Sequence, residues 1–397
     1  MFVKFKNAFL ACFGIIVGIF LGFGIFRLIP YLPLPFNSPV FSLLGINKPQ
    51  VIGFMPYWLA AKATNNYGSK ITTLDYFSLT IGSDGHIVKL ATPQQEDPGW
   101  YDLQTTMVDK KFQEARDNHM VLSLTVSQAD ESTIADLIKN PSKSASNLLS
   151  DVIPVMKKYD FSDLNVDIES FKDANTKDRE QFLTFLKIIK NELKKNNYTL
   201  TVDIAPVAFV KSQLIDPIKV GNIADYMFIM GYDYHTVLSS NTGPIAPLGG
   251  IGKETEFDVL TALSIAKQEI DPKKIIFGIP LYGYEWDSLS SNPGSATIPD
   301  TGETASNRRM EGIFTSKCST CLIKKDFLAD EPDFIYQDKK GDPYFHQAFL
   351  LDANSFRKRI LVAKENGFAG VGLWALGYEG NNLLQSLVSY KASFILK

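Results

Sequence analysis

Short apolar runs alternate with longer amphipathic stretches along most of the chain. The apolar runs have the length of buried strands and are rich in Val, Ile, Leu, Phe and Tyr. They predict eight strands, at 51–57, 76–81, 121–126, 164–168, 200–205, 226–230, 275–279 and 371–375. Apolar residues at helical spacing between them predict helices, most clearly at 107–117, 178–196, 256–269 and 354–366.

Eight strands separated by helices favour one α/β fold, a closed (β/α)8 TIM barrel. An open doubly wound sheet more often has five or six strands. The interval between the last two predicted strands is far longer than a helical crossover needs. We therefore expect a barrel domain at 48–397, with a small α+β insertion at about 282–352 after the seventh strand, on the catalytic face.

The N-terminal region has the pattern of a membrane anchor. Lys4 and Lys6 precede an uncharged run, 7–26, whose length approaches the ~20 residues of a membrane-spanning helix. No small-residue cleavage motif closes the run, so we expect an uncleaved signal anchor, a transmembrane helix at 1–28. A Pro-rich linker at 29–47 would then connect it to an extracytoplasmic body of a single-pass cell-membrane protein. Lipid attachment at Cys12 is a lesser alternative.

Composition excludes some partners. The chain has 40 basic and 43 acidic residues, so its formal net charge of −3 gives no reason to expect a nucleic-acid partner. Its four histidines show no metal-ligand spacing, and we expect neither a metal site nor a cofactor. Cys318 and Cys321 form a lone C-x-x-C pair, which predicts a local disulfide in an extracytoplasmic protein.

The predicted strand at 164–168 carries the clearest candidate chemistry. Asn165, Asp167 and Glu169 occupy every second position and so share one face of an otherwise apolar strand. Buried polar groups on such a face cost desolvation unless they are paired or bind a ligand. Two carboxyls roughly 6 to 7 Å apart along a strand perturb each other's ionisation. We expect one of them to stay protonated near neutral pH, as a general acid requires, whereas a solvated edge strand would need no such chemistry.

The segment 161–169, FSDLNVDIE, resembles the D-G-x-D-x-D-x-E signature of glycoside hydrolase family 18. Four further segments fit that family in barrel order. They are VIGFMPYW at 51–58, MGYDY at 230–234, FGIPLYGYEW at 277–286 and GVGLWALG at 370–377. The resemblance covers about residues 50–395 and implies a barrel enzyme that cleaves glycosidic bonds.

The resemblance also implies catalytic roles. Glu169 would protonate the glycosidic oxygen. Asp167 would orient the 2-acetamido group of the substrate, whose own carbonyl oxygen attacks the anomeric carbon in a substrate-assisted, retaining reaction. Tyr232 would donate a hydrogen bond to that carbonyl and stabilise its developing charge.

Six further residues are implied as substrate contacts, with structural alternatives open for several. Trp374 would stack on the reacting sugar or pack as a core tryptophan. Met230 would line the site, although filling the barrel core is the main alternative. Surface or insertion packing competes at the aromatic positions near the strand ends. The full set is Asn165, Asp233, Trp374, Tyr57, Tyr282 and Met230.

The signature departs from the usual family pattern in two places. Ser162 and Asp163 stand where Asp-Gly is usual, and Asn165 replaces the middle aspartate. An amide can hydrogen-bond Asp167 but cannot share a proton with it. The N-x-D-x-E form, and the absence of Gly-Gly at 123–127, resemble the bacterial cell-wall and spore-associated subgroup.

These features predict a membrane-anchored glycoside hydrolase acting on β-1,4 linkages of a glycan that contains N-acetylglucosamine, with peptidoglycan ahead of chitin. The alternative is a catalytically silent, lectin-like member that binds the same glycans. A third interpretation is a hydrolase for another sugar that uses two carboxylates. That enzyme would need a second acid, for which Glu285 and Glu379 are the candidates.

Overall fold

The structure, a computed structural model, describes residues 46–170, 172–252, 255–316, 318–380, 383–393 and 395–396. The expected anchor and nearly all of the expected linker lie outside these residues. Among the helices that are described, none combines the length and the apolar composition needed to cross a bilayer.

Eight parallel strands close into a barrel, as predicted, in the order β10-β16-β2-β3-β6-β7-β8-β9. All eight overlap the strands expected from the apolar runs. Their bounds are β2 (Gln50–Pro56), β3 (Thr73–Thr80), β6 (Val121–Gln128), β7 (Asp163–Ile168), β8 (Thr199–Ile204), β9 (Tyr226–Met230), β10 (Ile275–Pro280) and β16 (Gly370–Trp374).

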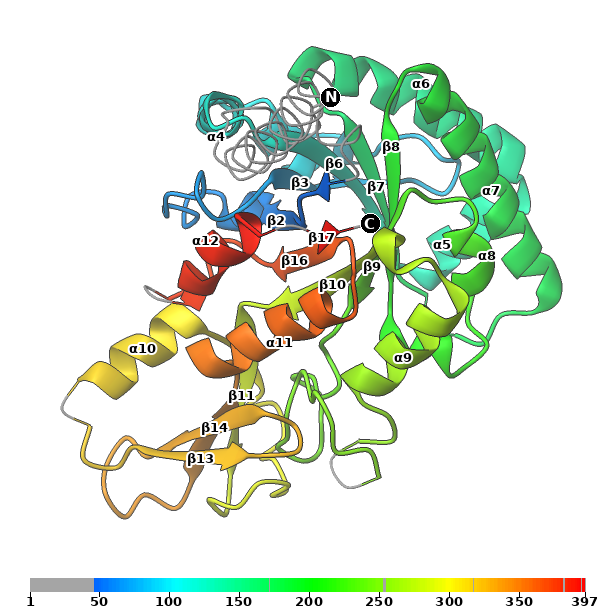
Figure 1. Cartoon of the computed structure of the whole chain (residues 1–397). Helices are drawn as coiled ribbons and strands as arrows, with labels where there is room; N and C mark the ends of the chain where they lie inside the picture. Colours follow the sequence, from blue (N-terminus) through cyan, green and yellow to red (C-terminus); the bar gives the residue numbers. More distant parts are fainter. Residues whose placement is uncertain are drawn as a thin grey trace, which may run out of the picture. The chain divides into compact units, whose positions relative to one another are not determined.

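Helices cover the outside of this barrel (Figure 1). They are α3 (Pro98–Leu103), α4 (Thr106–Asp117), α5 (Glu131–Lys139), α6 (Pro141–Tyr159), α7 (Thr176–Lys195), α8 (Pro217–Gly221), α9 (Val259–Glu269), α11 (Ala353–Glu365) and α12 (Ser386–Lys391). The remaining short elements are η2 (Tyr57–Leu59), η3 (Pro206–Phe209), η4 (Pro272–Lys274), η5 (Leu383–Gln385), β1 (Ile46–Asn47), β4 (Leu90–Thr92), β5 (Gln95–Glu96) and β17 (Ile395–Leu396).

The strand β7 shows how the barrel separates its apolar and polar residues. All six of its residues are buried, so the solvated edge strand considered above is wrong. Leu164, Val166 and Ile168 belong to the main hydrophobic core, which also contains the buried stripe of α7. Because side chains alternate along a strand, Asn165 and Asp167 point the opposite way, into the barrel.

Between β10 and α11 the chain forms a five-stranded antiparallel sheet in the order β12-β11-β15-β14-β13. Figure 1 shows this sheet and α10 together at one side of the barrel. Cys318 and Cys321 form a disulfide in the loop before β13, as expected. The bounds are β11 (Tyr282–Ser288), β12 (Glu303–Ser306), α10 (Asn307–Thr315), β13 (Leu322–Asp326), β14 (Glu331–Tyr336) and β15 (Phe345–Phe349).

Candidate active site

Glu169 stands at the carboxyl end of β7, the end at which TIM barrels carry their active sites. Its backbone N–H donates to the carbonyl oxygen of Gln128, at the end of β6, over 2.9 Å. The Glu169 side chain lines a cavity of about 370 Å³ together with Met230, Tyr232 and Asp233. The other lining residues are Ala205, Pro206, Val207, Tyr234, His235, Thr255, Glu256 and Phe257.

Asp167 lies deeper, inside the barrel, and is buried. Burial raises its pKa well above the usual range of an aspartate, and the charges of Glu169 and Asp75 raise it further. Burial also raises the pKa of Glu169, followed by the charge of Asp233. A raised pKa shifts a carboxyl toward its protonated form, which is the direction that general-acid catalysis requires.

Tyr232 and Asp233, which follow the sixth barrel strand, line the cavity, whereas Tyr282, after the seventh strand, contacts them without lining it. The hydroxyl of Tyr282 donates to Asp233, and the rings of Tyr232 and Tyr282 meet edge to face with centroids 6.1 Å apart. Burial raises the pKa of both tyrosines well above 10, so their hydroxyls remain hydrogen-bond donors. The Tyr232 hydroxyl is thus suited to donate a hydrogen bond to an oxygen of a bound sugar.

Trp374, the last residue of β16, packs against the same aromatic cluster as Tyr232 and Tyr282. Its ring is half-buried and meets Phe77 at a centroid distance of 4.5 Å. The ring centroids of Trp58 and Trp374 are 6.4 Å apart, and these two rings also meet edge to face. None of these three aromatic residues lines the cavity at Glu169.

The structure separates the two neighbouring aromatics of η2. Tyr57 is partly buried against the main core, and burial raises its pKa, followed by the charges of Asp97 and Asp102. Trp58 is 48% exposed and reaches toward Trp374. Of the two, Trp58 therefore presents the open ring on the Trp374 side.

Three polar residues from neighbouring strands join Asn165 and Asp167 inside the barrel, and the sequence did not single them out. They are Asp75 of β3, Thr125 of β6 and Asp203 of β8, all buried. The signal was present as polar residues at alternate positions of four consecutive strands. Those positions are Thr73 and Asp75; Ser123, Thr125 and Ser127; Asp163, Asn165 and Asp167; Thr201 and Asp203.

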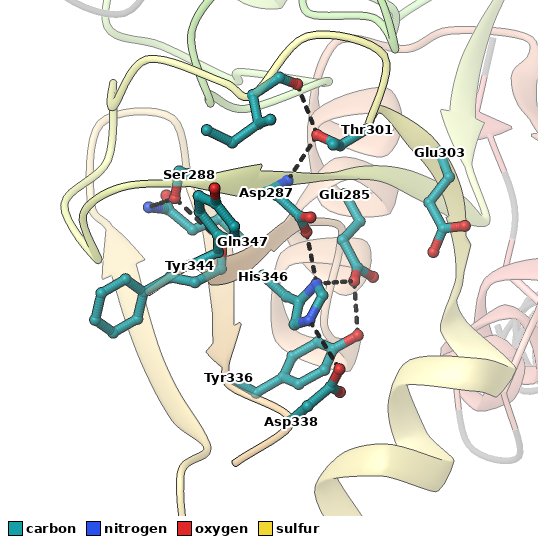
Figure 2. Close-up of polar contacts among 12 residues, drawn as sticks. Glu285, Asp287, Ser288, Thr301, Glu303, Tyr336, Asp338, Tyr344, His346 and Gln347 are labelled. Atoms are coloured by element: carbon teal, nitrogen blue, oxygen red, sulfur yellow. Dashed lines mark hydrogen bonds and ion pairs between the residues drawn. The ribbon is translucent and has the colours of Figure 1, made fainter. Parts of the chain in front are cut away.

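The two other candidate acids are held in structural contacts. Glu285 is buried in the antiparallel sheet, where it accepts a hydrogen bond from the Tyr336 hydroxyl over 2.6 Å (Figure 2). Its Oε2 atom also lies 2.5 Å from Nη2 of Arg309. Figure 2 also shows His346 beside Glu285, with its Nδ1 atom 2.8 Å from Asp287. Both oxygens of Glu285 are thus occupied by contacts within the inserted region.

Glu379 is likewise buried. It accepts hydrogen bonds from Tyr67, Asn65 and the backbone N–H of Gly377. Neither this carboxylate nor Glu285 lines the cavity at Glu169. Across the described ranges, no group of three or more His, Cys, Asp and Glu side chains is arranged to hold a metal ion.

Comparison with known proteins agrees with the fold and the motif. The model of the family described as "Glycosyl hydrolases family 18" matches residues 50–379. The "Cortical fragment-lytic enzyme" of Bacillus cereus is 24% identical over 326 residues, which are 80% of this chain and 67% of that protein. The "Putative sporulation-specific glycosylase YdhD" of Bacillus subtilis (strain 168) is 24% identical over 261 residues, covering 64% of this chain and 56% of the relative.

The chain spans about half to two-thirds of the length of these curated relatives. Among solved structures, the Bacillus cereus spore cortex-lytic enzyme SleL has a TM-score of 0.64 at 23% identity, covering 86% of this chain and 74% of its own. The Ostrinia furnacalis Group IV chitinase has a TM-score of 0.72 at 19% identity, covering 87% and 100%. At these identities the solved structures establish the fold.

Proposed function

The chain belongs to glycoside hydrolase family 18 and is similar to its spore and cell-wall members, and from this we propose its reaction. It hydrolyses β-1,4 linkages of a glycan that contains N-acetylglucosamine. One observation carries this proposal. Glu169, a carboxyl with a raised pKa, lines the cavity at the carboxyl end of the barrel together with Tyr232. A protein that only binds glycans needs no such proton donor.

The geometry favours a reaction in which the substrate supplies its own nucleophile. A retaining pair of enzyme carboxylates must flank the sugar about 5 to 5.5 Å apart, and this family is an exception to that rule. Asp167 and Glu169 approach from one strand and hence from one side. Glu169 then protonates the leaving oxygen, Asp167 orients the acetamido group, and Tyr232 stabilises its carbonyl as that oxygen attacks.

The other candidate residues, in and around the cavity, are assigned to substrate binding. Trp374 supplies the stacking face for the reacting sugar, and Asp233, held by Tyr282, borders the same position. Met230 lines the cavity beside them. Asn165 acts inside the barrel through its contacts with neighbouring strands, and Tyr57 supports the exposed Trp58 through an edge-to-face contact.

Peptidoglycan is the proposed substrate ahead of chitin. Relatives named for spore cortex lysis support this order, although chitinases occur among the fold neighbours. The uncharged run at 7–26 supports a membrane-anchored protein whose barrel lies outside the cytoplasm, against the cell's own envelope. The anchor is tested by fractionation, because the full chain should sediment with membranes and a chain starting at residue 48 should not.

A reducing-end assay tests the function. Wild type and Glu169→Gln are incubated with purified peptidoglycan and, separately, with chitin oligomers. We expect wild type to release reducing ends, and the variant to be slower by about 10²–10⁴-fold, the usual contribution of a general acid. Glu192→Gln, at a partly exposed ion pair with Lys195 on α7, is the matched control and should keep full activity.

Two outcomes would contradict the proposal. Equal release by wild type and Glu169→Gln would remove Glu169 from the reaction. Binding of either glycan by wild type without any release of reducing ends would establish the lectin-like alternative instead.

A further inference from the structure

Asn165 sends both of its amide hydrogens toward neighbouring strands. Its Nδ2 atom lies 3.2 Å from Thr125 Oγ1 and 3.1 Å from Asp203 Oδ2. Thr125 in turn donates to Asp75 Oδ1 over 2.6 Å. Asn165 is thus linked by hydrogen bonds to Asp203 directly and to Asp75 through Thr125. The amide oxygen of Asn165 has no hydrogen-bond partner in the described part of the chain.

Three aspartates in this part of the barrel are buried without a compensating cation. Asp75, Asp167 and Asp203 are 1%, 4% and 3% exposed. One oxygen of each lacks a hydrogen-bond partner, and none of the three forms an ion pair with a described residue. Buried like charges this close cannot all be ionised, so the cluster must retain protons.

The strand register makes Asp203 the cross-strand neighbour of Asp167. Parallel pairing of β7 with β8 joins Asn165 to Thr201 and Val166 to Val202. The next residue on each strand is Asp167 and Asp203, respectively. Neighbouring strands lie about 4.8 Å apart, and residues at one level of a parallel pair point to the same side. The two carboxyls therefore face each other inside the barrel.

We propose that Asp203 is a positioning residue that shares a proton with Asp167, a role that the amide at position 165 cannot fill. This inference rests on the proposed function. The O–H bond of Asp167 breaks, the proton passes to the carboxylate of Asp203, and a new O–H bond forms there. Asp167 is left as an anion beside Glu169, able to accept the acetamido N–H of the substrate. No further reactant is needed.

Asn165 and Thr125 hold this arrangement in place. Because Asn165 donates to Asp203 Oδ2, the other oxygen of Asp203 remains free to exchange the proton. The Thr125 hydroxyl accepts a hydrogen bond from the second amide hydrogen and donates one to Asp75. These two bonds fix the rotation of the amide. The aspartate missing from the β7 signature is thus replaced by one on the next strand.

The test is an exchange of the two side chains. Asp203→Asn keeps the shape and an acceptor for Asn165 but removes the carboxylate that takes the proton from Asp167. We expect kcat to fall by at least about tenfold, the equivalent of one pKa unit, with KM unchanged and the pH–rate profile displaced. The double variant Asn165→Asp/Asp203→Asn, which moves the carboxyl back to β7, should recover both kcat and the wild-type profile.

Asp163→Asn is the matched control. Asp163 is buried on the same strand but is bonded to hydroxyls of Ser123, Thr199 and Thr201. This variant should lower the melting temperature and leave the pH–rate profile unchanged. An Asp203→Asn variant with the wild-type kcat and profile would overturn the inference, as would a double variant no better than Asp203→Asn.

An infrared measurement decides the inference without turnover. Wild type at neutral pH should show the carbonyl stretch of a protonated carboxyl. The band should shift in Asp203→Asn, because the proton then belongs to Asp167 alone, or, if that variant does not fold, in Asn165→Asp. A band that neither variant alters would overturn the inference. If wild type cleaves no glycan, the proposed function fails, and this band still decides whether Asp203 shares the proton of Asp167.

Discussion

Asp333→Asn should stabilise the protein by an amount that grows with pH. Asp333 lies on β14 and is 1% exposed, and neither of its carboxylate oxygens has a hydrogen-bond partner in the described residues. Burial raises its pKa from 3.8 to about 8, against the opposing charge of Lys324. The folded protein therefore holds a proton on this group that the unfolded chain has already released.

The sign and size follow from proton linkage. The native state binds one more proton than the unfolded state between about pH 4 and pH 8, so stability is full below this window and is lost as pH rises through it. The loss is about 1.4 kcal/mol for each pH unit, or about 6 kcal/mol in all. An asparagine at this position does not ionise, so the variant escapes the loss.

Urea denaturation of wild type and Asp333→Asn at pH 5, 6 and 7 measures the effect. The difference in unfolding free energy should grow by about 1.4 kcal/mol per pH unit in favour of the variant. Asp136→Asn, at an exposed ion pair on α5, should give a small and constant difference. A difference between wild type and Asp333→Asn that stays constant over this range would refute the reasoning.

Three other substitutions separate binding, protonation and stability. Trp374→Ala, made in the Glu169→Gln background, should weaken glycan binding at least about tenfold in calorimetric titration, because the stacking face is lost. The hydrogen bond that the Tyr282 hydroxyl donates to Asp233 lowers the pKa of that carboxyl, and Tyr282→Phe removes it. The limb of the pH–rate profile governed by Asp233 should therefore move to higher pH. Glu285→Gln should cost about 2 kcal/mol of unfolding free energy, measured in urea, through its contacts to Arg309 and Tyr336, with kcat unchanged.

The barrel strands could be predicted because each is a short run in which apolar residues are either continuous or alternate with polar ones. The strand β7 stood out for a second reason, because polar residues at alternate positions are unusual in a fully buried strand. The helix α6 had weaker local signals, because Pro141 begins it and Pro154 lies inside it. Its buried stripe, which includes Leu148 and Val152, becomes evident only against the barrel.

The catalytic residues could be named from the motif, but their surroundings could not. Thr201 and Asp203 alternate with apolar residues as they would on many half-buried strands. Only the pairing of β8 with β7 brings Asp203 level with Asp167. Long-range register of this kind depends on the closure of the whole barrel and leaves no local trace in the sequence.

The neighbouring aromatics Tyr57 and Trp58 show a similar limit. Both follow β2 directly, and the sequence does not reveal which ring faces outward. The turn η2 directs Tyr57 to the core and leaves Trp58 exposed near Trp374. The direction of the 3-10 helix η2 thus decides that Trp58, and not Tyr57, is open to a sugar.

The central claim is that Glu169 acts on a sugar whose own acetamido oxygen attacks the anomeric carbon. The most direct test measures kcat on a series of glycan substrates whose N-acetyl groups carry none, one, two or three fluorine atoms. Each fluorine withdraws electrons from the attacking carbonyl oxygen, so kcat should fall steeply along the series. The same kcat for all four substrates would contradict the claim.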